Sequence, residues 1–94
     1  SKAQFAQCGF DTSKYHFITE PGTFTAYLDL KVWGKRCLEC FFTFADGRKI
    51  VACTFPEADY LSLADIPIGT NLRLTFEETV RSKRIYLRKA EVVL

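Results

Sequence analysis

The sequence lacks a long apolar run, and it also lacks a charged start followed by an apolar stretch. A membrane-spanning helix needs about 20 consecutive apolar residues, and a secretory signal needs a short apolar core behind positive charge. Neither kind of segment is therefore expected in these 94 residues. We expect a cytoplasmic protein without a membrane partner.

Residues that support catalysis or hold cofactors are scarce. His16 is the only histidine, and it lies between Tyr15 and Phe17 in a short extended stretch, where we expect a structural role. The chain has no glycine-rich phosphate loop and no partner for His16 that would suggest a nucleophile or a metal. We expect a non-catalytic protein with no cofactor.

Four cysteines are present, at Cys8, Cys37, Cys40 and Cys53, but their spacing is not that of a typical metal site. Cys37 and Cys40 form a C-x-x-C pair inside an expected strand, where residues three apart point to opposite faces. A zinc knuckle places such a pair on a turn and adds a second close pair, which this chain lacks. We expect ordinary buried thiols and no metal, with disulfides or a zinc site as the alternatives.

The chain does contain material for one compact core. Apolar residues make up 48% of it and aromatic residues 15%. A chain of this length forms a single domain. Because residues 1–22 show little regular pattern, we expect an irregular N-terminal arm over 1–22 and one domain over 23–94.

Apolar and polar residues alternate along most of this domain, with the two-residue period of half-buried strands. In the strictest stretch, 23–33, the pattern puts Phe24, Ala26, Leu28, Leu30 and Val32 on one face. The other expected strands cover 37–45, 48–55, 71–77 and 85–94, with a short helix over 57–64. Asp46-Gly47 predicts a tight antiparallel hairpin, because both residues accept the positive dihedrals of a primed turn.

The expected order is three strands, a short helix and two strands, so the sequence predicts an all-β fold. This order resembles that of the OB-fold family, a partly open five-stranded barrel with its helix between the third and fourth strands. The Asp46-Gly47 hairpin and the segment Pro67-Ile68-Gly69-Thr70 add to the resemblance. It implies a small OB-like β-barrel, although an SH3-like barrel or a small sandwich has the same order.

The resemblance also implies a ligand site on the second and third strands, between two loops that are basic here. Single-stranded nucleic acid needs cations for its phosphates and flat rings on which its bases stack. We therefore expect binding of single-stranded DNA or RNA. The expected site residues are Lys31, Trp33, Lys35, Arg36, Phe41, Arg73, Arg81, Lys83, Arg84, Tyr86 and Arg88.

Other interpretations remain. The net charge is only +2, and strong nucleic-acid binders are usually more basic. In place of binding a ligand, Trp33 could cover the end of a barrel, and Phe41 could pack under the N-terminal segment. The alternative function is a protein-interaction or homo-oligomerisation module that uses the N-terminal arm, which is rich in aromatic residues for so irregular a stretch: Phe5, Phe10, Tyr15 and Phe17.

Overall fold

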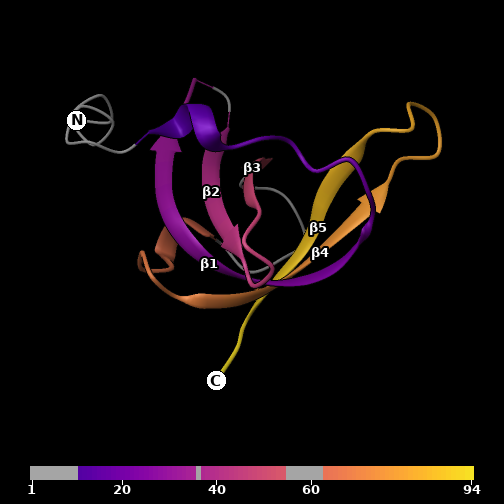
Figure 1. Ribbon diagram of the computed structural model, residues 1–94. Helices are drawn as coiled ribbons and strands as arrows, with labels where there is room; N and C mark the ends of the chain where they lie inside the picture. Colours follow the sequence, from indigo (N-terminus) through magenta and orange to yellow (C-terminus); the bar gives the residue numbers. More distant parts are fainter. Residues whose placement is uncertain (1–10, 36, 55–62) are drawn as a thin grey trace.

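The computed structural model describes residues 11–35, 37–54 and 63–94. Within them, five strands form one antiparallel sheet in the order β3-β2-β1-β4-β5 (Figure 1). The strands are β1 Gly22–Trp33, β2 Leu38–Phe44, β3 Lys49–Thr54, β4 Asn71–Glu78 and β5 Ile85–Val92. Two short 3₁₀ turns accompany them, η1 Thr12–Lys14 and η2 Leu63–Asp65.

The all-β fold predicted from the alternation is confirmed. Each expected strand corresponds to an observed one, and the Asp46-Gly47 hairpin joins β2 to β3. Phe44 both donates to Arg48 O and accepts from Gly47 N across the turn. Gly47 has φ 95°, but Asp46 does not have a positive φ, so the hairpin is confirmed while the primed turn predicted for it is wrong. The expected helix over 57–64 falls mainly outside the described residues, and η2 is the described part of this connection.

A β-bulge at Asp29 reverses the two faces of β1. Leu28 pairs with Phe42, whereas Leu30 pairs with Phe41, so Asp29 is an extra residue of β1. Because successive side chains of a strand point to opposite faces, one inserted residue turns all later side chains to the other face. The single apolar face predicted for 23–33 is therefore wrong beyond Leu28.

The bulge decides where two predicted site residues point. Lys31 pairs with Cys40 and Trp33 pairs with Leu38, and both partners are buried in the main core. Directly paired residues share a face of the sheet. The sequence pattern placed Lys31 and Trp33 on the outer side, away from the core, and that placement is wrong: both lie on the core side.

The main core fills the inner side of the curved sheet. Ile18 from the N-terminal segment and Leu63 and Ile66 from the β3–β4 connection complete it. The described part of the expected arm is therefore joined to the domain. The strands contribute most of this core, including the buried residues Ala26, Leu28, Cys40, Phe42, Phe44, Leu72, Leu74, Phe76 and Leu87.

The N-terminal segment covers the outer side of β2 and β3. His16 donates its backbone N–H to Lys49 O and accepts from Val51 N, both at 3.0 Å, which adds a parallel bridge to the free edge of β3. The Tyr15 ring packs edge-on against Phe41, with 5.1 Å between ring centroids. A second, smaller core forms beneath it from Leu30, Phe41 and Val51.

The sheet is curved but not closed. Its two outermost strands, β3 and β5, approach each other, with some Cα atoms within 8 Å. In the described part of the chain, no hydrogen bond joins their backbones. We call the gap between the two strands the seam. In Figure 1, β3 and β5 lie on either side of it.

Candidate nucleic-acid interface

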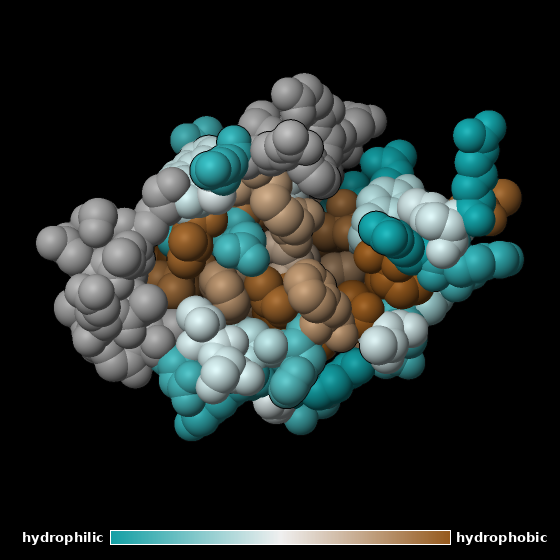
Figure 2. Space-filling view, turned by 90° about the horizontal axis from the view of Figure 1, so that it is seen from above, coloured by the Kyte–Doolittle hydropathy of each residue, from teal (hydrophilic) through white to brown (hydrophobic). Residues whose placement is uncertain are grey.

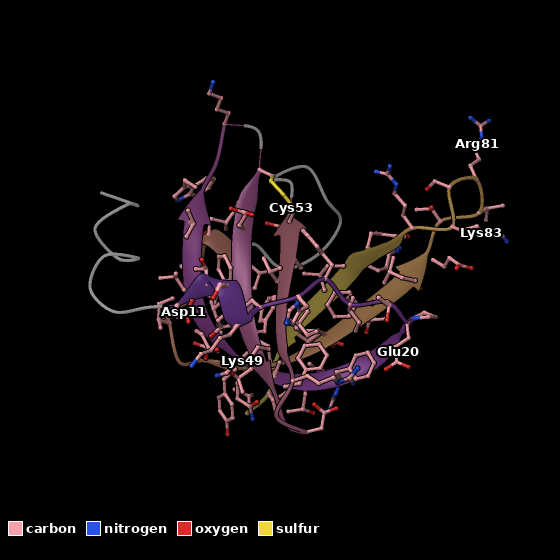
Figure 3. The ribbon with its side chains drawn as sticks, turned by 45° about the horizontal axis from the view of Figure 1, so that its top comes forward. Asp11, Glu20, Lys49, Cys53, Arg81 and Lys83 are labelled. Atoms are coloured by element: carbon pink, nitrogen blue, oxygen red, sulfur yellow. A yellow bond between two sulfur atoms is a disulfide. The ribbon has the colours of Figure 1, made fainter. Side chains whose placement is uncertain are left out.

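Two hairpin loops flank the upper end of the seam. A disulfide between Cys37 and Cys53 joins the β1–β2 loop, 34–37, to the end of β3. The Cα atoms of the two cysteines are 6.0 Å apart. Cys53 in turn lines the same cavity as Ile85 and Tyr86, which directly follow the β4–β5 loop, 79–84. We call this end of the molecule, with both loops, the open end. Figure 3 shows Arg81 and Lys83 on the far loop, at the same end as Cys53.

The expectation of ordinary thiols is wrong for Cys37 and Cys53. Cys53 pairs in register with Glu39, so Cys37, just before β2, lies diagonally across from it at a distance that suits a disulfide. Cys40 is free and buried, as expected, and burial raises the pKa of its thiol to about 12. Cys8 lies outside the described residues, among which no group of three potential ligands could hold a metal.

The β4–β5 loop is ordered by hydrogen bonds of its own. Thr79 N donates to Arg84 O at 2.8 Å, and Lys83 N donates to Thr79 O at 3.0 Å. Lys83 has φ 58°, a left-handed conformation that closes the loop. Arg81, Lys83 and Arg84 are all exposed, and no ion pair engages them within the described residues. Three free cations are thus held on one short loop.

Tyr86 and Arg88 share one acidic neighbour. Glu77 Oε1 accepts from the Tyr86 hydroxyl at 3.3 Å and lies 3.9 Å from Arg88 Nε. Tyr86 remains 40% exposed, so its ring is accessible from the solvent. The cation of Arg88 is partly balanced by Glu77, so Arg88 attracts an anion less strongly than the loop cations would.

Arg73 is not brought to the open end. It lies on β4 opposite Thr25 and Glu91, five residues before the end of that strand at Glu78. At about 3.4 Å per residue, this places it roughly 17 Å along the strand from the loop. The structure therefore separates Arg73 from the other predicted cations.

Lys31 has a structural role in place of the predicted phosphate contact. Its ammonium donates to Ala64 O at 2.9 Å and to Ile66 O at 2.7 Å. These two bonds fasten the β3–β4 connection to the end of β1. Because the bulge turns Lys31 to the core side, its charge is used inside the fold.

The β1–β2 loop presents the other accessible site residues. Trp33 is 48% exposed at the end of β1, and Lys35 is exposed on the loop. Gly34 N donates to Cys37 O at 2.9 Å, which closes the turn. Arg36 lies outside the described residues. The end of β1 and this loop thus place a flat ring and a cation at the open end.

Phe41 is not available as a stacking platform. It does lie on the outer side of β2, but it is only 6% exposed, beneath Tyr15. The N-terminal segment packs over this face because Asp29, the bulged residue, accepts hydrogen bonds from the Tyr15 hydroxyl and from Thr43. Packing under the N-terminal segment, the alternative considered for Phe41, is confirmed, and the β2–β3 face is not an open ligand surface.

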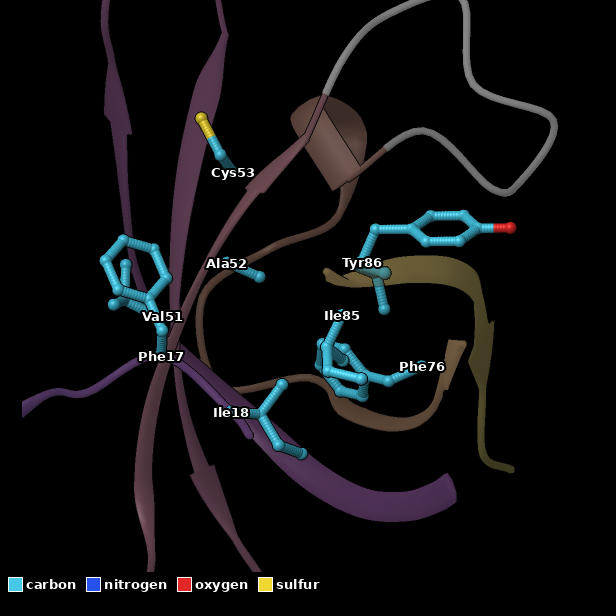
Figure 4. Close-up of a pocket in the computed structure, with 9 residues that line it drawn as sticks. Phe17, Ile18, Val51, Ala52, Cys53, Phe76, Ile85 and Tyr86 are labelled. Carbon is cyan, nitrogen blue, oxygen red and sulfur yellow. The ribbon is translucent and has the colours of Figure 1, made fainter. Parts of the chain in front are cut away.

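The sequence pattern missed a cavity at the seam and the ring beside it. The cavity has a volume of about 130 Å³ and lies between residues 17–18 and 51–53 on one side and Phe76 and residues 85–87 on the other (Figure 4). Phe17, at its rim, is 70% exposed. The abundance of aromatic residues in the N-terminal arm was the only available signal, since the seam itself is created by the topology.

The described residues include no helix that is long and apolar enough to cross a membrane. We found no protein-family model, no curated protein and no solved structure that matches this chain.

Proposed function

We propose that this chain is a non-catalytic, OB-like domain that binds single-stranded DNA or RNA at its open end. The observation that carries the proposal is the placement of two cationic loops on either side of one seam, with exposed rings beside them. Trp33 and Lys35 lie on one side, and Arg81, Lys83, Arg84 and Tyr86 lie on the other. The OB-like assignment draws on the strand order, the open sheet and the hairpin between β2 and β3.

This arrangement suits the chemistry of a single strand. Its phosphates need accessible cations, and its unpaired bases need flat apolar surfaces, which a duplex does not offer. The three cations of the β4–β5 loop are exposed and unpaired within the described residues. Their contacts are with the backbone of the ligand, so we expect little preference for sequence and strong dependence on salt.

The test is a pair of charge-matched double variants. Arg81→Gln with Arg84→Gln removes two cations from the open end, and Lys14→Gln with Arg73→Gln removes two exposed cations elsewhere. Lys83 is left unchanged because its φ of 58° is part of the loop. Binding of a labelled mixed-sequence single strand is followed by fluorescence anisotropy at several salt concentrations.

We expect the loop variant alone to weaken binding and to flatten its salt dependence. For single strands, each phosphate contact contributes about 0.7 to the slope of log K against log salt, so losing two contacts lowers the slope by about 1.4. Equal effects of both variants would mean that the attraction is only a matter of net charge. That result would contradict a site at the open end.

Homo-oligomerisation through the N-terminal arm remains the alternative function. In the described part of the arm, Tyr15 and Ile18 pack on the sheet of their own chain, but Phe17 stays exposed. An interaction module of this kind predicts a mass above that of one chain in light scattering, lost on removal of residues 1–20, together with no binding of oligonucleotides.

A further inference from the structure

The seam cavity has the size and lining of a site for one flat ring. Its volume is about 130 Å³. An apolar protein cavity of about 150 Å³ is known to take up benzene, so one six-membered ring is the natural occupant. Ile18, Ala52, Ile85 and Leu87 supply apolar walls, and Phe17 stands at the opening; Tyr86 lies across from it, but its ring points away from Phe17 (Figure 4).

The surface around the cavity changes from apolar to charged. Figure 2 looks onto the open end and shows apolar side chains across its middle, with hydrophilic ones around them. The β4–β5 loop ends at Arg84, the residue before Ile85 of the cavity wall. Glu77, which would repel an anion near Tyr86, is engaged by Tyr86 and Arg88. A ring bound in the cavity would therefore have the three cations of the β4–β5 loop beside it, together with the carboxylates of Glu78, which pairs with Ile85, and Glu39, which pairs with Cys53.

The edge of β3 also offers polar atoms to such a ring. Lys49 O and Val51 N point to the free edge of β3, where they bond His16. Alternate residues of a strand direct their backbone groups to the same edge, so Cys53, the next in this series, presents its N–H and C=O to the seam. No backbone bond from β5 reaches them in the described part of the chain.

We propose that the seam cavity receives one unstacked nucleobase beside the Phe17 ring, while the neighbouring phosphates lie on Arg81, Lys83 and Arg84. This inference rests on the proposed function and adds a base site to it. The base site lies between β3 and β5, and it differs from the β2–β3 face that the family resemblance implies. A thymine, with its single ring, matches the cavity volume.

The experiment separates the base from the phosphates. Affinities are measured for a 15-mer of thymidylate and for an abasic 15-mer, which keeps the phosphates and lacks all bases. The variants are Phe17→Ala, Tyr86→Phe and, as the control, Ile68→Ala, which removes an exposed apolar side chain that does not line the cavity. Phe17 is largely exposed, so its replacement leaves the fold intact, and thermal unfolding verifies this.

We expect the wild-type protein to prefer the thymidylate strand by about 5- to 150-fold, the range for stacking of one base. Phe17→Ala abolishes most of this preference and leaves the abasic strand bound as before, whereas Tyr86→Phe and Ile68→Ala retain the preference. Equal affinity of the wild type for both strands overturns the base site and any stacking on the exposed rings, and leaves only the phosphate contacts of the proposed function. An undiminished preference in Phe17→Ala overturns the base site alone. Failure to bind either strand overturns both.

Discussion

Replacing Lys31 with methionine tests whether this lysine belongs to the fold or to the ligand site. Methionine keeps most of the apolar stem and removes the ammonium, which donates at 2.9 Å to Ala64 O and at 2.7 Å to Ile66 O. Hydrogen bonds from a charged donor contribute about 1.5 to 3 kcal/mol each, and losing the donor leaves both carbonyls to be satisfied by water. Since the site is only partly buried, we expect a loss of about 3 kcal/mol in the free energy of unfolding.

The assay is urea denaturation and thermal unfolding, with single-strand binding measured on the same samples. For a domain of this size, 3 kcal/mol corresponds to a fall in Tm of roughly 12 to 24 °C. Below the new Tm, binding should be unchanged, because the Lys31 charge does not reach the ligand. An unaltered Tm with severalfold weaker binding would refute this reasoning and would restore Lys31 to the phosphate contacts predicted from the sequence.

Two further predictions concern the covalent and the hydrogen-bonded ties that hold the open end and the N-terminal segment. The Cys37–Cys53 disulfide spans a sequence separation of 16 and therefore restricts the unfolded chain. Replacing both cysteines by serine should lower the free energy of unfolding by about 3 kcal/mol, measured by chemical denaturation. A loss below about 1 kcal/mol would show that the disulfide restricts the unfolded chain little. Desolvation, together with the Asp29 carboxylate, raises the pKa of Tyr15 to about 12. Because the folded pKa lies above the usual value near 10, the stability that depends on protonated Tyr15 is complete below pH 10 and is lost as pH rises toward 12. Tyr15→Phe should make Tm fall less steeply than in the wild type over this interval, and identical slopes would contradict the assignment.

The sequence predicts the strands and the β2–β3 hairpin because both are local properties. Alternation marks each half-buried strand, and Asp46-Gly47 marks the turn without knowledge of anything distant. The bulge at Asp29 is different, since Leu30 and Val32 continue the apolar pattern as if nothing had changed. They face the outer side, where Tyr15 covers them as part of a second core. Apolar residues at these positions would fit either the main core or the second core, and the local pattern cannot tell which of the two they face.

The exposure of the candidate site residues was predicted best in the loops. Lys35, Arg81, Lys83 and Arg84 are exposed, as expected from polar hairpin loops. The accessibility of the strand residues was predicted less well, because the direction of their side chains depends on the strand register. Lys31 bonds backbone carbonyls inside the fold, and Phe41 is buried beneath the N-terminal segment. The Cys37–Cys53 disulfide and the seam cavity likewise require tertiary placement, which no spacing along the chain provides.

Binding of a labelled single strand to the charge-matched double variants tests the central claim most directly. The account predicts saturable binding at low salt by the wild type and by the Lys14→Gln, Arg73→Gln protein, with weaker and less salt-dependent binding by the Arg81→Gln, Arg84→Gln protein. No binding by the wild type at low salt, or equal losses in the two variants, would contradict the claim that the open end of this sheet is a nucleic-acid interface.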